Sequence, residues 1–238
     1  MKNMTNIIIA IILAFGLIGT GYFIKSGLIA INSADRYVTV KGLAEQDVKA
    51  DLAMWAIQFK VANNILDDAK IELQRQSTLI ENFLKNNGIK SEEISNNRVT
   101  INDALANQYQ GNRVATRYAI DKTILVRTNN VDAIHAASQK IGDLISDGVL
   151  IGYGAVPQYS YTKLNTIKPQ MIADATKNAR ASAQQFANDS GASVGAIKSA
   201  TQGYFSINAR DNVPGSSPSA SLNKRVRVVS TVQYYIDD

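Results

Sequence analysis

Alanine returns at every fourth position in the segment "DATKNARASAQQFANDSGAS", which runs from Asp174 to Ser193. The four positions are Ala175, Ala179, Ala183 and Ala187. Residues four apart share one face of an α-helix, so these side chains form a narrow stripe of methyl groups. Side chains this short allow the helix axis to approach a sheet closely, and alanine has the highest helix propensity. The spacing predicts a helix that opens after Pro169, ends at Gly191 and packs through its alanines.

A second face of the same helix is polar. It carries Lys177, Arg180, Gln184 and Asn188. Side chains of this kind either remain in water or contact a neighbouring subunit, and we expect this face to form part of an interaction surface.

Alternating apolar and polar residues predict three long strands, at "DLAMWAIQFKV", "RYAIDKTILVRT" and "RVRVVSTVQYYI", and shorter ones at "YVTVKG", "NRVTIN" and "VPQYSYT". Two more helices are predicted between them, one from near Asn64 to Gly88 and one from near Asn130 to Gly148. An Asn-Asn pair joins strand to helix in both places. This echo indicates two strand–helix–strand units, and therefore an α+β fold made by duplication.

The stretch from Ser206 to Asn223 is rich in serine, proline and other turn-forming residues and contains few apolar ones. That composition predicts a long mobile loop, residues 206–223, between the last two strands. We expect it to be the second part of the interaction surface.

The N-terminal segment Ile7–Ile24 contains no charged residue. Its length approaches the roughly 20 residues that cross a hydrocarbon core, and it exceeds the apolar run of a cleavable signal peptide. We therefore expect residues 7–24 to enter the membrane as an uncleaved signal anchor within residues 1–34, ahead of one extracytoplasmic domain at 35–238. A cleaved leader is the alternative. The lysines and arginines around the segment do not decide its orientation.

Composition argues against several classes of protein. The chain of 238 residues has no cysteine, one histidine (His135) and a net charge of +5. Its tightest basic cluster, Lys224, Arg225 and Arg227, falls inside a strand pattern without interleaved aromatics, which is not typical of a nucleic-acid surface. No nucleophile elbow, phosphate-binding loop or calcium loop is present in the sequence. We expect no catalytic, cofactor-binding or metal-binding residues, no nucleic-acid partner, and a surface or partly packed His135.

Several segments resemble the SIMPL domain. The late helix "IADATKNARASAQQFANDSGASVGAI" is similar to the alanine repeat of that family, with Phe186-Ala187 in place of its usual Leu-Ala. The opening "VTVKGLAEQDVKADLAMWAIQF" is similar to the start of the domain. Its matching residues are Val40, Gly42, Asp51 and Ala53, while Ala44 and Ala50 replace a glycine and a proline. "GIKSEEISNNRVTI" resembles a further family segment, with Glu93-Ile94 in place of Asp-Ile.

The resemblance implies a bacterial, mostly extracytoplasmic α+β domain that self-associates and is linked to the cell envelope and to oxidative-stress tolerance. It supplies no catalytic residues. We therefore expect a non-enzymatic, single-pass protein of the inner membrane, with its domain facing the periplasm, that forms homo-oligomers or binds an envelope partner. Two alternatives remain open. One is an extracytoplasmic hydrolase or ligand-binding protein with a deep pocket, and the other is a cytoplasmic domain tethered in the reverse orientation.

Overall fold

The computed structural model describes residues 13–25, 36–106, 115–152, 155–211 and 217–237. Two compact units make up the chain, and each is assembled from separate segments. Unit 1 comprises Met1–Ala44, Pro169–Phe205 and Val228–Asp238. Unit 2 comprises Glu45–Lys168 and Ser206–Arg227.

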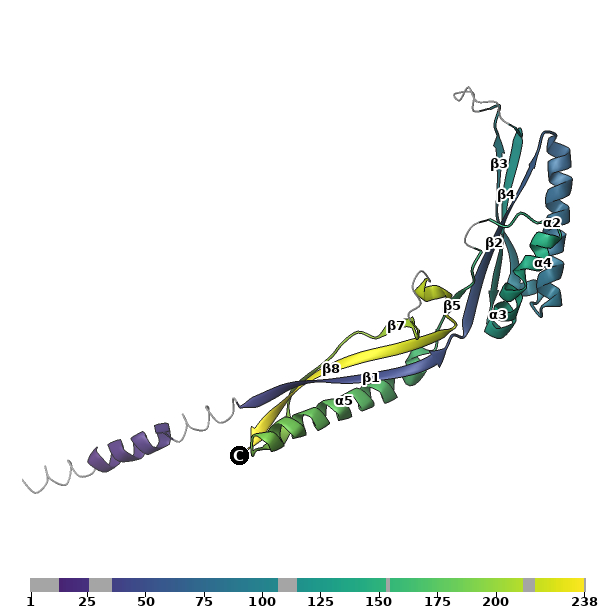
Figure 1. The fold of residues 1–238 in the computed structure, drawn as a ribbon. Coiled ribbons are helices and arrows are strands. Elements are labelled where there is room, and N and C mark those ends of the chain that lie inside the picture. Colours follow the sequence, from purple (N-terminus) through teal and green to yellow (C-terminus); the bar gives the residue numbers. More distant parts are fainter. Residues whose placement is uncertain (1–12, 26–35, 107–114, 153–154, 212–216, 238) are drawn as a thin grey trace, which may run out of the picture. The chain divides into compact units, whose positions relative to one another are not determined.

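Helices and strands are mixed in the α+β manner that the sequence predicts, with two sheets (Figure 1). The strands are β1 (Tyr37–Lys49), β2 (Leu52–Asn63), β3 (Ile94–Asp103), β4 (Tyr118–Thr128), β5 (Gln158–Ser160), β6 (Ser193–Gln202), β7 (Ser206–Ala209) and β8 (Asn223–Asp237). The helices are α2 (Leu66–Asn86), α3 (Val131–Gln139), α4 (Ile141–Ser146) and α5 (Leu164–Asp189), with 3-10 turns η1 (Ser91–Glu93) and η2 (Pro218–Ala220).

The sheet of unit 2 has the order β3-β4-β2-β5, and its neighbouring strands are antiparallel. Along the chain its elements run β2-α2-β3 and then β4-α3-α4-β5, so two strand–helix–strand units follow one another as expected. Because β4 lies between β2 and β3, the arrangement is a split β-α-β fold. Helices α2, α3 and α4 cover one face of this sheet (Figure 1).

The core of unit 2 lies between that sheet and its helices. Trp55, Ile57 and Phe59 alternate along β2 and are fully buried, which confirms the predicted phase of this strand. The partners in the same cluster are Ile80 and Leu84 of α2, Ile124 and Val126 of β4, Ile134 and Ala137 of α3, and Leu144 of α4.

Each predicted glycine stop is confirmed. Gly88, Gly148 and Gly191 have φ values of 87°, 85° and 71°, in the left-handed region that favours glycine. The next residue donates back into the last turn in each case, for example from Ile89 N to Leu84 O at 3.1 Å and from Val149 N to Leu144 O at 3.0 Å. This is the Schellman motif, and Ile89 and Val149 are buried against the core.

The predicted helix start near Asn130 is confirmed, because Asn130 is the N-cap of α3 and its side chain accepts from Ala133 N at 3.2 Å. The other two predicted starts are less accurate. Helix α2 begins at Leu66, because Asn63 and Asn64 accept hydrogen bonds from Ile65 N and Arg117 N and do not cap it. The second predicted helix is divided near Lys140 into α3 and α4.

Helix α5 begins at Leu164, about one and a half turns before Pro169. The prediction placed the start of the helix after Pro169, because proline is commonest at the very beginning of a helix. Here Pro169 lies inside the helix, where its missing N–H removes one hydrogen bond close to the first turn.

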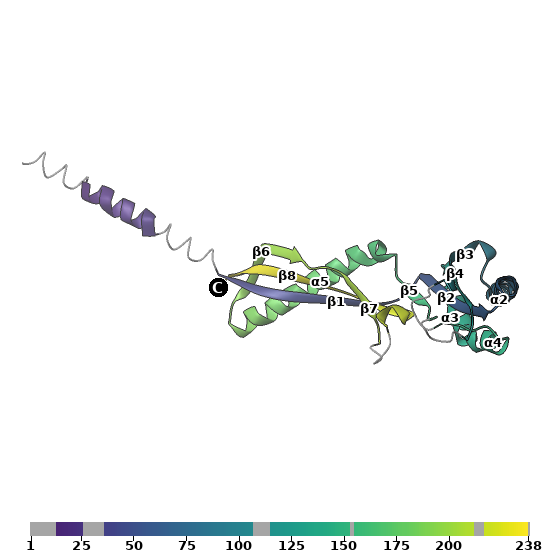
Figure 2. The same cartoon turned by 90° about the horizontal axis from the view of Figure 1, so that it is seen from above.

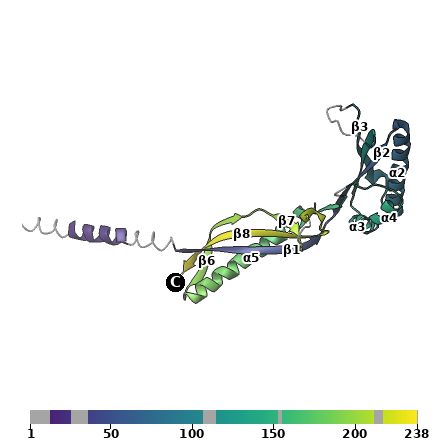
Figure 3. The same cartoon turned by 45° about the horizontal axis from the view of Figure 1, so that its top comes forward.

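The second sheet has the order β1-β8-β6, with β6 and β1 on opposite sides of β8 (Figure 2), and β7 also pairs with β8. Helix α5 runs alongside β1 and β8 (Figures 1 and 3). The core cluster consists of Val40 from β1, Ala179 and Ala183 from α5, and Val232 and Tyr234 from β8. The alternation predicted for β8 is confirmed at Val226, Val228, Val232 and Tyr234.

The predicted loop 206–223 contains regular structure. Residues Ser206–Ala209 form β7, which pairs with β8 from Arg227 back to Lys224, and Pro218–Ala220 form η2. The prediction of a structureless segment was therefore wrong at both of its ends. Residues 212–216 lie outside the described part of the chain.

Residues 13–25 are helical, and their large apolar side chains are exposed. The remainder of the predicted span, residues 7–12, lies outside the described residues. Within the part that is described, no helix is both long and apolar enough to cross a membrane.

Candidate functional site

The closest approach of helix to sheet in unit 1 is at Gly42. A Cβ atom placed on this glycine would lie 1.8 Å from the carbonyl oxygen of Ala175 and 2.5 Å from the amide nitrogen of Ala179. Backbone therefore lies directly on backbone, with no side chain between β1 and α5. Asn178 strengthens the contact by donating from Nδ2 to the carbonyl oxygen of Leu43 at 2.7 Å.

This contact explains the alanine repeat. Ala175, Ala179 and Ala183 are completely buried and Ala187 nearly so, which confirms the predicted packing stripe. A longer side chain at any of these positions would force the helix away from the strand. The polar face of α5 is exposed, as expected for the side chains Lys177, Arg180, Gln184 and Asn188.

The other motif residues also hold the structure together. Asp51 accepts from Thr162 N at 2.8 Å and from Thr162 Oγ1 at 3.1 Å, and so attaches the segment that precedes α5 to the start of β2. Ala44, Ala50 and Ala53 are buried. None of these groups is arranged for chemistry.

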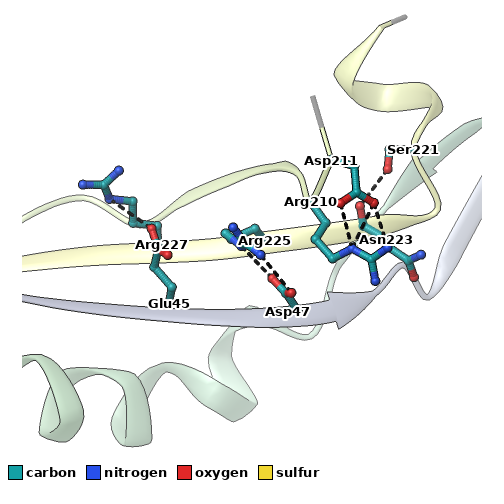
Figure 4. A network of polar contacts seen from close by, with 8 residues as sticks. All are labelled: Glu45, Asp47, Arg210, Asp211, Ser221, Asn223, Arg225 and Arg227. Carbon is teal, nitrogen blue, oxygen red and sulfur yellow. Dashed lines mark hydrogen bonds and ion pairs between the residues drawn. The ribbon is translucent and has the colours of Figure 1, made fainter. Parts of the chain in front are cut away.

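The basic cluster noted in the sequence is largely neutralised. Arg225 donates two hydrogen bonds to Asp47, at 2.7 and 3.0 Å, and Arg227 lies 3.7 Å from Glu45 across the β1–β8 pair (Figure 4). Arg210 similarly pairs with Asp211 at 2.7 Å. The hydrogen bonds from Arg225 lower the pKa of Asp47, and those from Arg210 lower the pKa of Asp211. A surface with this alternation of charge does not favour phosphate backbones.

Lys224 behaves differently from its two basic neighbours. It lies at an inward position of β8, in phase with Val226, and only 4% of it is exposed. Its ammonium donates to the carbonyl oxygens of Pro218 at 2.8 Å and Ser219 at 3.3 Å. Burial lowers the pKa of Lys224.

A hollow of about 300 Å³ adjoins this lysine within unit 2. It is lined by Tyr159, Ser160 and Tyr161, by Ile207 of β7, by Pro218 and Ser219 of η2, and by Lys224.

Two further acids in unit 2 have a lowered pKa, Asp103, which accepts from Arg117, and Glu72 on α2. Hydrogen bonds from Arg75, at 2.6 and 2.8 Å, and from Gln76, at 2.8 Å, lower the pKa of Glu72 to about 2. All three groups lie within one turn of the same helix. This arrangement stabilises the helix surface and provides no proton donor or acceptor for a substrate.

His135 lies on the exposed side of α3, as predicted. Its ring meets the ring of Tyr159 edge-on, with the centroids 6.4 Å apart. No carboxylate or hydroxyl among the described residues hydrogen-bonds to the imidazole, and no cluster of potential metal ligands is found among them.

From Arg98 to Ile101 the outer edge of β3 has no strand partner among the described residues, since β3 pairs only with β4. The opposite side of the sheet is different, because β2 there pairs with β5 and bonds to Leu150 and Gly152. On β3, Val99 and Ile101 remain 53% and 51% exposed. A bulge between Asn96 and Arg98 shifts the register of β3 against β4, and the pairing continues beyond it to Ile94.

The profile of one protein family, described as "SIMPL: Protein of unknown function (DUF541)", matches residues 38–234. The chain belongs to the SIMPL family. The match spans segments of both units, so the SIMPL domain of this chain includes the Gly42–α5 contact and the Lys224 hollow. No curated protein matches the sequence.

Two features of this SIMPL domain were not predicted. Lys224 was grouped with Arg225 and Arg227 as surface charge, although the alternation of β8 places it with the inward residues. The exposed edge of β3 depends on strand order, and a single strand pattern does not reveal its neighbours. The two parts of the expected interaction surface belong to different units, because the polar face of α5 lies in unit 1 and residues 206–223 lie in unit 2.

Proposed function

We propose that this SIMPL protein is held in the bacterial cytoplasmic membrane by its N-terminal segment and acts on the extracytoplasmic side through self-association, without catalysis. The uncharged run Ile7–Ile24 supports the anchor. Exposed apolar side chains on helix 13–25, such as Leu17 and Phe23, support a lipid or protein environment around it.

The observation that carries self-association is the open edge of β3. A strand edge presents unpaired N–H and C=O groups, which a second strand can satisfy. From Arg98 to Ile101 the pairing of β3 with β4 is regular, and Val99 and Ile101 lie on the same face with half of each side chain in water. Soluble proteins usually protect such an edge, so this strand is suited to pairing.

The occupant that fits this edge is a second copy of the chain. In an antiparallel pair with its two-fold axis at Thr100, Val99 of each copy would lie opposite Ile101 of the other. Apolar cross-strand pairs of this kind stabilise a sheet, and a two-fold axis repeats every contact. The pairing would join two four-stranded sheets into one.

The mass of the intact protein in a mild detergent, measured by light scattering, tests this proposal. We expect a dimer or a multiple of it. Val99→Lys should raise the dimer dissociation constant by about tenfold or more, because a charge at a strand edge opposes pairing. Ile71→Lys is the matched control, since Ile71 is 70% exposed on α2 and not on the edge. A wild-type protein that is monomeric at all concentrations would refute self-association, and equal effects of the two variants would refute the β3 interface.

The orientation has its own test. Alkaline phosphatase fused after Asp238 should be active in the periplasm, whereas an inactive fusion would favour the reverse orientation.

A role in oxidative-stress tolerance predicts that a strain lacking the protein is sensitive to peroxide, and that tolerance is restored by the wild type and not by Val99→Lys. Restoration by both would separate stress tolerance from assembly through β3.

Duplication is the origin that we propose for unit 2. In its support, both strand–helix–strand units carry Asn-Asn where the first strand ends, at Asn63-Asn64 and Asn129-Asn130. Both also end their helical part with a left-handed glycine and a buried branched residue, at Gly88-Ile89 and Gly148-Val149.

A further inference from the structure

Lys224 occupies a position where β8 would ordinarily carry an apolar side chain. Its strand neighbour on the same face is Val226, and the face is buried. An ammonium group loses its hydration when it is buried, and proteins usually compensate it with a carboxylate. The burial of Lys224 therefore requires an explanation.

Among the described residues, the acceptors for this ammonium are neutral. Pro218 and Ser219 each contribute a backbone carbonyl oxygen, and no described carboxylate lies within ion-pair distance. Residues 212–216, which precede η2, contain no aspartate or glutamate that could supply one. Burial alone lowers the pKa of Lys224, with no opposing charge.

The nearby carboxylates are already paired with other residues. Asp47 is held by Arg225, Glu45 lies near Arg227, and Asp211 is held by Arg210 (Figure 4). Because Arg225 and Arg227 alternate with Lys224 and Val226, these pairs form on the other face of β8. The lysine faces the hollow and the arginines face the acids.

We propose that the hollow beside Lys224 binds a small organic carboxylate. The carboxylate of the ligand would pair with the remaining N–H of the Lys224 ammonium, and its apolar body would lie against Ile207 and Pro218. Ser160, Tyr161 and Ser219 line the same space, and the hydroxyl groups that they carry are available to orient the ligand. A volume of about 300 Å³ is at the lower end of ligand sites and suits a short or single-ring acid.

This site goes beyond self-association and does not depend on it. The hollow lies within unit 2 between β5, β7, η2 and β8, whereas the proposed interface is the edge of β3. Loss of dimerisation therefore leaves the binding proposal intact, and the reverse also holds.

The test uses 4-fluorobenzoate as a probe, followed by fluorine NMR line broadening on the intact protein in lipid nanodiscs. The probe of matched size and opposite charge is 4-fluorobenzylammonium. We expect the anion to bind and the cation not to bind. Lys224→Met keeps the apolar stem and removes the charge, and should weaken binding by about tenfold to a hundredfold, the range of one charge-assisted hydrogen bond. Lys177→Met removes an exposed lysine from α5 and should leave binding unchanged.

Two further measurements keep the proposal falsifiable if Lys224→Met disturbs folding. Ile207→Trp fills the hollow and retains the lysine, so it should also abolish binding. Binding by the wild type should decline as the pH rises through the pKa of Lys224, which lies below its usual value of 10.5, because the neutral amine cannot pair with a carboxylate. No broadening at millimolar 4-fluorobenzoate, equal binding of the two probes, or unchanged binding by both variants would overturn the proposal.

Discussion

Replacing Gly42 with alanine tests the contact between β1 and α5 with a single methyl group. The new Cβ atom would lie 1.8 Å from Ala175 O, whereas ordinary contacts begin at about 3.4 Å, so the helix would have to retreat by roughly 1.6 Å. A gap of that size removes much of the dispersion attraction between the alanine stripe and the strand. Overpacking of this kind costs up to about 3 kcal/mol.

An opposing contribution comes from the unfolded chain. Alanine lowers the conformational entropy of the unfolded chain relative to glycine. This stabilises the folded state by about 0.4–1 kcal/mol where the backbone conformation is allowed. Gly42 does not have a positive φ, so this contribution applies. The free energy of unfolding should therefore fall by up to about 2–2.6 kcal/mol, and the Tm by up to roughly 10 °C.

The assay is thermal unfolding of the full-length protein in detergent by circular dichroism, combined with hydrogen exchange. Exchange should accelerate in α5, where the contact is lost. Gly142→Ala is the matched control, because nothing lies within 4 Å of its added Cβ atom. That change within α4 should stabilise the protein by up to about 1 kcal/mol. If the free energy of unfolding of Gly42→Ala lay within about 0.5 kcal/mol of the wild-type value, and hydrogen exchange in α5 were unchanged, the proposed backbone contact would be refuted.

Three further outcomes follow from the packing and charge of single residues. Ala183→Leu should lower the Tm by several degrees because Ala183 is fully buried, whereas Ala181→Leu, exposed on the same helix, should change it little; equal effects would contradict the stripe. The pKa of Glu72 is about 2 in the folded protein and 4.5 ordinarily, so its contribution to stability is present above pH 4.5 and is lost as the pH falls toward 2. The difference in Tm between the wild type and Glu72→Gln should shrink over that interval, and a constant difference would contradict the assignment. The single tryptophan, Trp55, is fully buried, so its emission should be blue-shifted and resist acrylamide quenching until unit 2 unfolds, and early quenching would contradict its burial.

Local pattern was sufficient to predict most elements of this fold. Alternation identified β2, β4 and β8, because each has one face against a core and one face away from it. The glycine stops were predicted correctly because few residues other than glycine adopt the left-handed conformation that a Schellman motif requires. Both signals depend on neighbouring residues in the chain.

The errors arose where distant segments decide the outcome. Residues Ser206–Ala209 have loop-like composition but form β7 because β8 offers hydrogen bonds. The helical signal of Leu164–Lys168 is weak, and the proline that follows masked it. The stripe of α5 was predicted as a packing surface, yet only the structure identifies Gly42 as the residue against which it packs.

The candidate sites were less accessible to sequence reasoning than the fold. The inward position of Lys224 could have been predicted from the alternation along β8. Lys224 lies two residues from Val226 and so shares its face of the strand, whereas Arg225 lies on the other face. The partners of Arg225 and Arg227 could not be predicted, because Glu45 and Asp47 are about 180 residues away in the sequence. The strand order that makes β3 an edge strand likewise could not be predicted from the sequence.

The interleaved connectivity of the two units sets the order in which they can be completed during synthesis. Unit 2 requires Ser206–Arg227 and unit 1 requires Val228–Asp238, so both wait for β8, although most of unit 2 has emerged by Lys168. Until then β1 lacks the strand beside it, and α5 has only part of its binding surface. The apolar residues of β1 and α5 therefore remain without their strand partner until β8 has been synthesised, and a ribosome stalled before Asn223 would leave both units incomplete.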